Sequence, residues 1–383
     1  MPTYHDLGIK PIINAAATLT RLGGSRMPPP VVAAMAAGAQ AFIDLPELQA
    51  RVGARIAELT HNQACYVASG AAAGVALATA ACIAGTDPAA IAGFPKLDGR
   101  KSEVIVHRSQ RNGYDYAIRQ TGAQLIEIGT LETTQRRELE HALSAQTACV
   151  VYFAGEHFAR GALPLPEVIA IAHARGVPVL VDAAAQIPPI ANLWRFTNEL
   201  GADLAIFSGG KGLRGPQPSG LVLGRPDLIA ACQVNGSPNS SIGRPMKVGK
   251  EELLGILAAV EWSLALDEPA LIAGYEATVR QWIAGLQEIK GVTATRGYPN
   301  EAGQPFGRAI VRFDSACDLT RDQVVAALLV GDPAVAVGVI DADCIALNPQ
   351  TIEPGEAGLV LTALRRALGI GRCLHLSTPA VRV

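Results

Sequence analysis

The chain has 383 residues, of which 49% are hydrophobic and 17% are charged. This length exceeds an average domain and the apolar fraction suffices for a large core, so one large and one small domain are expected. A formal net charge of -2 excludes a strongly basic protein and argues against nucleic acid as a partner.

The 7 cysteines are scattered through the sequence and form no CxxC pair. An odd count with irregular spacing is expected of reduced thiols in the cytoplasm rather than of a disulfide framework. Residues 1–10 lack the basic segment and apolar core of a signal peptide. Residues 64–86 carry no charge, but Ala and Gly dominate them, which favours a tightly packed internal helix over a membrane span.

The N-terminal part, residues 1–30, is predicted to be an irregular arm. Gly23, Gly24 and the prolines at 28–30 oppose long regular structure there. Apolar periodicity then predicts two helices, a short strand and the start of an Ala-rich helix, at 31–42, 48–59, 64–68 and near residue 69.

Further along, short β-branched runs alternate with helical stretches. The runs show no polar alternation, as is typical of strands buried on both faces. Strands are predicted at 104–106, 125–128, 149–153, 177–181, 204–207 and 221–223, with helices between several of them at 114–120, 133–143 and 165–174. The pattern predicts an α/β fold with a mostly parallel sheet covered by helices, and ligands beyond the carboxyl ends of its strands.

Loop-forming residues dominate 229–245 and are expected to close a large domain that spans 31–245. The remainder, 246–383, is predicted to be a small α+β domain. It opens with a long helix from Lys250 and continues with strands at 309–313, 334–340 and 374–376 and helices at 321–329 and 355–369.

Lys211 stands among glycines directly after a buried strand, in the segment 207–217. Glycines permit positive φ and let a bulky ligand approach the lysine closely. An amine bonds to a carbonyl only when it is partly deprotonated, and burial or a cation such as Arg214 would lower its pKa. A covalent cofactor lysine is therefore one interpretation, and a solvated turn or a phosphate-clamping lysine is the alternative.

Asp182 directly follows the predicted strand at 177–181, and a carboxylate at this buried strand end needs a cation or a hydrogen-bond donor. The nitrogen of a cofactor ring is one such donor, and a helix N-cap is the alternative role. Ser69 and Gly70 open the Ala-rich helix, whose free amides suit a phosphate, although small residues also serve close helix packing. Ser208, before Lys211, adds a second hydroxyl.

The order of these parts resembles that of fold-type-I enzymes that depend on pyridoxal 5'-phosphate (PLP), the aspartate aminotransferase-like fold. Within them, the chain is similar to the branch of bacterial selenocysteine synthase and D-glucosaminate-6-phosphate ammonia-lyase. The similarity extends over nearly the whole chain, in the stretches 13–26, 64–81, 104–118, 177–189, 207–224 and 241–252.

The resemblance implies that Lys211 is the Schiff-base lysine and catalytic base and that Asp182 holds the pyridinium nitrogen. It implies a phosphate site made by Ser69, Gly70, Ala71 and Ser208. Gln186 is a candidate for the cofactor hydroxyl. Where many relatives place a ring over the cofactor, this sequence offers Gln110 and Asn112.

Arginine usually binds a substrate carboxylate, because its planar fork matches the two oxygens. The candidates are Arg21, Arg26, Arg160, Arg244 and Arg372, although an arginine is more often a surface or structural residue. His157 follows a strand end and could act as an acid or base, or be structural. Metal binding finds no support, because the histidines show no HExxH or paired spacing.

The implied reaction is a lyase reaction on a hydroxylated amino acid: loss of the Cα proton, β-elimination of water, and release of a 2-oxo acid and ammonia. Racemisation and aldol cleavage are alternatives that the same cofactor supports. Selenium or sulfur transfer on seryl-tRNA is disfavoured by the absence of a basic surplus and of an extra N-terminal domain before the shared core. A non-catalytic PLP-binding protein is disfavoured by the presence of Lys211 and Asp182. A homodimer or higher homo-oligomer is expected, and no membrane partner.

Overall fold

The computed structural model describes residues 2–369 and divides into two compact units. The larger unit comprises Gly23–Glu268 and Glu301–Gln304. The smaller unit comprises, among the described residues, 2–22, 269–300 and 305–369.

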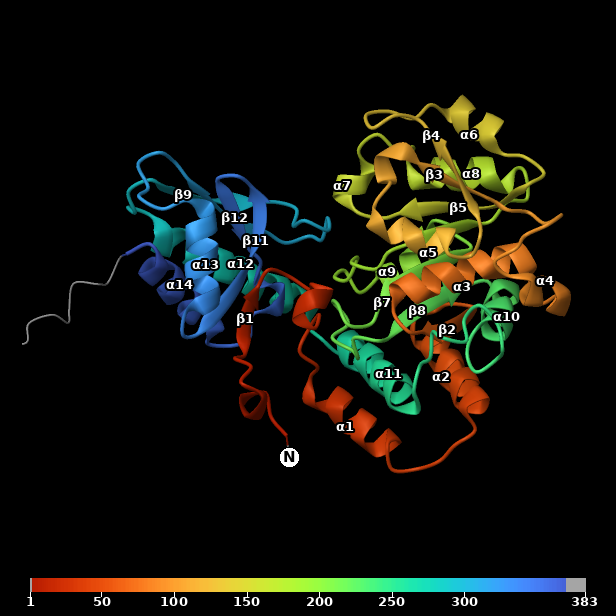
Figure 1. Cartoon of the computed structure of the whole chain (residues 1–383), viewed down its shortest axis with the longest axis horizontal. Coiled ribbons are helices and arrows are strands. Elements are labelled where there is room, and N and C mark those ends of the chain that lie inside the picture. The colour runs from red at the N-terminus through yellow and green to blue at the C-terminus, as the bar shows by residue number, and fades with distance from the viewer. Residues whose placement is uncertain (1, 370–383) are drawn as a thin grey trace, which may run out of the picture. The chain divides into compact units, whose positions relative to one another are not determined.

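The larger unit contains a 7-stranded sheet with the strand order β2-β8-β7-β6-β5-β3-β4 (Figure 1). The strands from β7 to β4 pair in parallel, and β8 pairs antiparallel with both of its neighbours. This confirms the predicted mostly parallel sheet. In sheet order, the strands are β2 (Ala64–Ala68), β8 (Gly220–Gly224), β7 (Leu204–Ser208), β6 (Val179–Asp182), β5 (Thr147–Phe153), β3 (Glu103–His107) and β4 (Gln124–Ile128).

Helices cover both faces of this sheet, because alternate strand residues enter two separate apolar clusters. One face packs on α3 (Ala71–Ala84), α5 (Tyr116–Arg119) and α10 (Pro226–Asn235). The other packs on α2 (Leu45–Leu59), α6 (Arg136–Ala142), α8 (Leu165–His173) and α11 (Lys250–Leu264). The remaining helices of this unit are α1 (Pro29–Gly38), α4 (Pro88–Gly93), α7 (Glu156–Ala159) and α9 (Asn192–Trp194).

The uncharged segment at 64–86 forms β2 and α3, as the sequence predicts. Close packing explains its small residues: a Cβ on Gly74 would lie 2.9 Å from Cγ2 of Ile206 on β7. Within residues 2–369, no helix combines the length and apolar character needed to cross a membrane.

The smaller unit contains a 5-stranded sheet with helices against it, an α+β arrangement. In sheet order its strands are β1 (Ile12–Ala15), β11 (Ala334–Asp341), β12 (Cys344–Leu347), β10 (Arg308–Phe313) and β9 (Val292–Gly297). Its core includes residues of α12 (Glu268–Leu286), α13 (Arg321–Val330) and α14 (Glu356–Ala367). The strand predicted at 374–376 lies outside the described residues.

Three features differ from the sequence-based expectation. The arm is not wholly irregular, because Ile12–Ala15 forms a strand that pairs in parallel with β11. Helix α11, expected in the small domain, packs against α1 and α2 and belongs to the larger unit (Figure 1). The loop expected at 229–245 begins later, because α10 continues to Asn235. For β1 and α11 long-range packing decided the outcome, and local composition does not record it.

The buried carboxylate of Asp203 connects three strands at the end of the large sheet where the parallel strands begin. Asp203 is 5% exposed and accepts hydrogen bonds from the Val179 amide at 2.7 Å and from the Arg225 guanidinium at 2.6 Å. The ring of His173 lies 2.8 Å from the same carboxylate. These contacts connect the starts of β6 and β7 with the end of β8.

We expect Asp203→Ala to lower the free energy of unfolding by about 3 kcal/mol, because it leaves a buried amide and a guanidinium without their acceptor. Urea unfolding followed by circular dichroism measures this loss. The control is Asp227→Ala, which removes the exposed partner of the same arginine and should cost less than about 1 kcal/mol. Equal losses in the two variants would contradict a special role for the buried carboxylate.

Candidate active site

The candidate cofactor residues gather where β6, β7 and β2 end. Asp182 pairs in register with Ile206, so Ser208 lies two residues further along the neighbouring strand and on the same face. Ser208 and Ala68 both face Gly220, on the strand between them. The fold therefore brings the predicted acid, one predicted hydroxyl and the start of α3 to a single face of the sheet.

Asp182 is a carboxylate with little solvation. Its Oδ1 accepts the amide of Ala184 at 3.0 Å, and no described residue donates a hydrogen bond to its Oδ2. Burial raises the pKa of Asp182, while the Ala184 hydrogen bond and the charge of Lys211 oppose that rise. An acceptor oxygen at this position suits a donor that arrives with a ligand.

The pKa of Lys211 shifts in the direction opposite to that of Asp182. Burial lowers the pKa of Lys211, and the charge of Asp182 opposes that decrease. The lysine is therefore more often neutral near pH 7 than an exposed lysine, and the neutral amine is the form that attacks a carbonyl or accepts a proton.

The loop that carries Lys211 is held by close backbone contacts. A Cβ on Gly210 would lie 2.6 Å from Cα of Gln217, and one on Gly212 would lie 2.1 Å from the carbonyl oxygen of Ile187. Any larger residue would displace the loop. The glycines around Lys211 therefore serve packing as well as ligand access.

The N-terminal segment at 23–26 binds the lysine loop, a contact that the sequence analysis missed. The Ser25 hydroxyl donates to the carbonyl of Lys211 at 2.7 Å, and its amide donates to the carbonyl of Gly210 at 3.0 Å. Arg214 Nε donates to the carbonyl of Arg26 at 2.8 Å. Arg26, a predicted substrate ligand, is thus brought next to the lysine loop, and its side chain is exposed. Nothing local in the sequence signals a contact between residues this far apart.

The start of α3 has the form of an anion site. Gly70 has φ 102°, and a Cβ there would meet open space, whereas one on Gly220 would lie 2.6 Å from the Gly70 carbonyl carbon. The missing side chain of Gly220 lets β8 pack directly against the backbone of Gly70 and Ala71, while the space at Gly70 itself stays open. The first amides of a helix have no intrahelical acceptors, so they can bind a phosphate.

Gln186 is engaged by protein groups. Its Nε2 donates to the carbonyl of Ala302 at 2.7 Å and to that of Ala154 at 3.2 Å. Both N–H donors therefore have acceptors within the larger unit. A contact between Gln186 and the cofactor hydroxyl stays a prediction.

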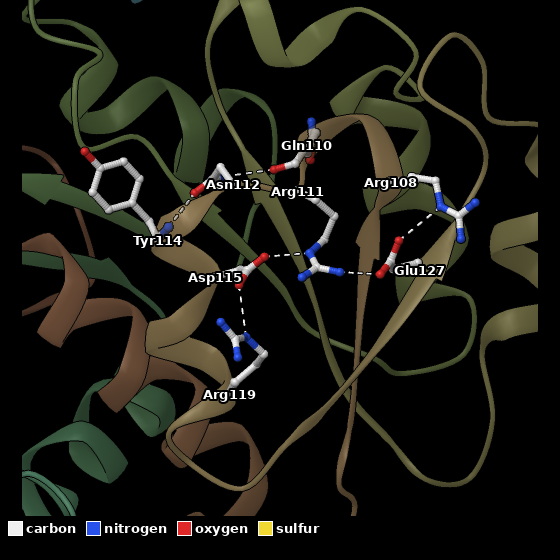
Figure 2. Close-up of polar contacts among 8 residues, drawn as sticks. All are labelled: Arg108, Gln110, Arg111, Asn112, Tyr114, Asp115, Arg119 and Glu127. Atoms are coloured by element: carbon white, nitrogen blue, oxygen red, sulfur yellow. Dashed lines mark hydrogen bonds and ion pairs between the residues drawn. The ribbon is translucent and has the colours of Figure 1, made fainter.

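Gln110 and Asn112 lie in a polar network beside the end of β3 (Figure 2). Gln110 is fully buried, and its Oε1 accepts the amide of Phe153 at 3.1 Å. Beyond it, ion pairs continue through a sequence of alternating charges drawn in Figure 2: Arg108, Glu127, Arg111, Asp115 and Arg119. Gln110 Nε2 donates to the carbonyl of Phe158 on α7 at 3.4 Å. Gln110 therefore connects the end of β5 with α7 and does not face a ligand.

His107 is a buried ring that directly precedes Arg108 of this network in the chain. It is fully buried, packs edge-on to Tyr152 at 5.8 Å, and neither ring nitrogen has a hydrogen-bond partner among the described residues. Burial lowers the pKa of His107 to about 4, so the ring is neutral at physiological pH. Nothing in the sequence marks this histidine as buried, because an apolar strand can also end in a solvated histidine.

The remaining candidates are dispersed. His157 and Arg160 lie exposed on and just after the short helix α7, where the His157 ring packs on Phe158 at 3.9 Å. Arg244 is exposed and lines a hollow with Gln120 and Ser241. Arg372 lies outside the described residues. The geometry thus brings Asp182, Ser208 and the start of α3 to one face of the sheet, and the roles of all the candidate residues stay predictions.

Comparison with known proteins agrees with this arrangement. Residues 100–240 match the aminotransferase class-V family. A 5'-C-glycyluridine monooxygenase-decarboxylase from Streptomyces sp is 34% identical, over 91% of this chain and 89% of its own. D-glucosaminate-6-phosphate ammonia lyase from Salmonella typhimurium is 32% identical, over 94% of this chain and 96% of its own. The chain belongs to the fold-type-I PLP-dependent enzymes.

Other comparisons agree with this family. A solved structure of D-glucosaminate-6-phosphate ammonia-lyase superposes with a TM-score of 0.83 at 31% identity, and covers 96% of this chain and 99% of its own. An L-seryl-tRNA(Sec) selenium transferase from Nitratidesulfovibrio vulgaris is 26% identical, over 92% of this chain and 80% of its own. The branch expected from the sequence is confirmed.

PLP, the cofactor of this fold-type-I family, fits the groups present. Its phosphate matches the open first turn of α3, and its ring nitrogen matches the available oxygen of Asp182. Its aldehyde matches a lysine whose pKa is lowered by burial. The match of the phosphate rests on space, that of the ring nitrogen on a hydrogen-bond acceptor, and that of the aldehyde on the nucleophilicity of the lysine.

His107 gives this fold-type-I enzyme a predictable acid sensitivity. The folded pKa of about 4 lies below the ordinary value of 6.5, so the unfolded chain binds more protons between these values. Stability is therefore fully present above pH 6.5 and is lost as the pH falls toward 4.

We expect the wild type to lose about 2 kcal/mol more stability than His107→Phe between pH 7 and pH 5. Urea unfolding at both pH values measures the difference. The exposed His141, changed to Gln, is the control and should keep the wild-type pH dependence. If His107→Phe keeps the same dependence as well, the buried ring does not titrate as proposed.

Proposed function

We propose that this chain is a PLP-dependent lyase that removes water from a hydroxylated amino acid and releases a 2-oxo acid and ammonia. The observation that carries the proposal is the placement of Asp182 at the end of β6 and of Lys211 in the loop after the neighbouring strand β7, where the charge of each opposes the effect of burial on the pKa of the other. The similarity to an ammonia lyase along nearly the whole chain supports the reaction type.

The residues have separate tasks in this reaction. When bound, PLP supplies an electron sink for the charge that develops at the substrate Cα. Asp182 holds the ring nitrogen through its available oxygen, and the start of α3 with Ser69, Gly70, Ala71 and Ser208 holds the phosphate. Lys211 Nζ accepts the Cα proton, which a lysine with a lowered pKa can do near neutral pH.

The β-hydroxyl and the carboxylate of the substrate need protein groups of their own. The hydroxyl on the β-carbon leaves as water with a proton from an acid, a role that we assign to His157. Uptake of water by the dehydrated product then releases ammonia and the 2-oxo acid. Arg26, Arg160, Arg244 and Arg372 are the candidates for the carboxylate, and Arg26 is the one whose backbone binds the lysine loop.

A second candidate function follows from the relative of 34% identity, which is named as a monooxygenase-decarboxylase of a glycyl nucleoside. That reaction breaks the bond from Cα to the carboxylate and consumes oxygen. Racemisation and aldol cleavage are further alternatives for the same site. An assay that follows ammonia, carbon dioxide, oxygen, aldehyde and substrate chirality separates all four.

We further propose that the enzyme is a cytoplasmic homodimer or higher homo-oligomer. Support for association comes from apolar side chains left exposed on α1 and the loop after it: Val32 at 49%, Phe42 at 104% and Ile43 at 46%. A second copy of the chain is the occupant we expect there.

The central prediction concerns Lys211→Ala and Asp182→Ala. We expect wild type to form a visible absorption band with PLP that borohydride removes, and Lys211→Ala to lack it. Asp182→Ala should keep a borohydride-sensitive band but lose at least about a hundredfold in kcat, because the ring nitrogen loses its partner. Absorption spectra and release of 2-oxo acid from a panel of D- and L-hydroxy amino acids check both. Wild type that stays colourless with PLP would refute the proposed function.

The association surface gives a separate prediction. Phe42→Asp should shift the mass measured by light scattering from the oligomer toward the monomer, because a charge at an apolar contact must be desolvated. Val330→Asp, at a side chain 80% exposed in the smaller unit, is the control and should leave the mass unchanged. A monomeric wild type would overturn the proposed association.

A further inference from the structure

A hollow of about 210 Å³ opens beside the first turns of α2. Its apolar lining comes from α2, β2, α10 and the segment before α11: Leu45, Pro46, Ala50, Val67, Val234 and Val248. An apolar cavity of about 150 Å³ accepts a benzene ring, whereas sites for small molecules have about 300–1,000 Å³. The hollow therefore has the size of one aromatic side chain rather than of a substrate or cofactor.

The amide side chains at the hollow bind neighbouring backbone. Gln49 Nε2 donates to the carbonyl of Val67 at 3.1 Å. Asn239 Nδ2 donates to the carbonyl of Gln233 at 2.9 Å and to that of Gly236 at 3.2 Å. Among the described residues, none that lines the hollow is charged. The hollow therefore suits an apolar occupant.

The loop that joins α1 to α2 (Figure 1) carries a side chain of matching size. Phe42 in this loop is 104% exposed, and Ile43 beside it is 46% exposed. At this exposure no residue between 2 and 369 covers the Phe42 ring. Burial of an aromatic ring against an apolar surface is favourable, so the ring is available to a second molecule.

The short distance along the chain between the ring and the hollow indicates which molecule that is. Phe42 precedes Leu45, the first lining residue, by three positions. In a twofold dimer the same surface of both copies meets itself, so a projecting group lies beside the hollow that receives its counterpart. A ring on a distant surface would instead join copies head to tail. The arrangement here favours a closed pair of identical chains.

The exposed side of α2 next to the hollow carries both signs of charge. Glu47 and Arg51 form an ion pair at 3.5 Å, and their side chains are 66% and 81% exposed. A surface of one sign repels its own copy, whereas a surface with both signs can align opposite charges across a twofold axis. The charges beside the hollow are therefore compatible with a second copy of the same chain.

We propose that this surface is the contact between two copies of the chain: Phe42 of each copy enters the hollow formed by α2, β2 and α10 of the other. The proposal rests on the homo-oligomer of the proposed function and adds which side chain binds which hollow. The ring and the hollow both belong to the larger unit. The contact uses none of the residues assigned to cofactor or substrate.

The test cross-links two variants of the full-length chain. Phe42→Cys and Ala50→Cys are co-expressed with different tags, and the product is treated with diamide, which takes up two electrons and two protons as two adjacent thiols form a disulfide. We expect a band at twice the mass of the chain on a non-reducing gel, with both tags, that dithiothreitol cleaves. Wild-type chains with the two tags give the background from the native cysteines.

The matched control pairs Phe42→Cys with Ala170→Cys, at an exposed alanine on α8 that does not line the hollow. This pair should give no band above the wild-type background. A band of equal intensity with Ala170→Cys would overturn the proposed contact, because the thiol at Phe42 would then react without regard to position.

A second measurement fills the hollow and leaves Phe42 in place. Ala50→Trp should raise the dimer dissociation constant, measured by sedimentation, at least about thirtyfold, since loss of a buried aromatic contact at an interface costs that much. Ala170→Trp introduces the same ring on α8 and should leave the constant at its wild-type value. Equal constants in Ala50→Trp and wild type would overturn the role of the hollow.

These results separate the contact from the proposed function. If wild type dimerises but Phe42→Cys and Ala50→Cys do not cross-link, the homo-oligomer stands and the contact between Phe42 and the hollow fails. If wild type sediments as a monomer, both the association and the contact fail, while the absorption band and the release of 2-oxo acid still decide the lyase. The combination that supports the contact is a mixed cross-link together with a weakened Ala50→Trp dimer.

Discussion

The site depends on two opposite charges held where water cannot fully solvate them. Burial raises the pKa of Asp182 and lowers that of Lys211, and the attraction between the groups limits both changes. Without the charge of Lys211 the pKa of Asp182 would be higher, and without the charge of Asp182 the pKa of Lys211 would be lower. Together they keep a hydrogen-bond acceptor and a partly neutral amine within one site, the combination that a pyridine ring and its aldehyde require.

The two charged side chains keep these positions only if the backbone that carries them is held in place. Strand pairing and close backbone contacts hold it. The strand ends bring Asp182 and Ser208 to one face of the sheet, which the parallel register fixes. The loop of Lys211 has no regular secondary structure and is held by close contacts at its glycines and by the hydroxyl of Ser25. Small residues are therefore required at these positions for steric reasons as well as for access.

Segments that are far apart in the chain meet in both units. The strand at Ile12–Ala15 joins the smaller sheet, and the segment at 23–26 binds the lysine loop of the larger unit. Along the chain, residues 301–304 lie between β9 and β10 of the smaller unit, yet they belong to the larger unit. A change at the N-terminal segment can therefore act on the lysine loop without altering any residue near it in sequence.

The sequence by itself determined the family, the sheet strands of the larger unit and the positions of Lys211 and Asp182 in the chain. These follow from local signals: continuous apolar runs, a carboxylate at a strand end and glycines around a lysine. Only the tertiary structure decided that α11 belongs to the larger unit, that Gln110 supports a strand end, and that Ser25 binds the lysine loop. Those contacts join residues far apart in the chain, and no local pattern records which distant backbone oxygen a side chain will meet.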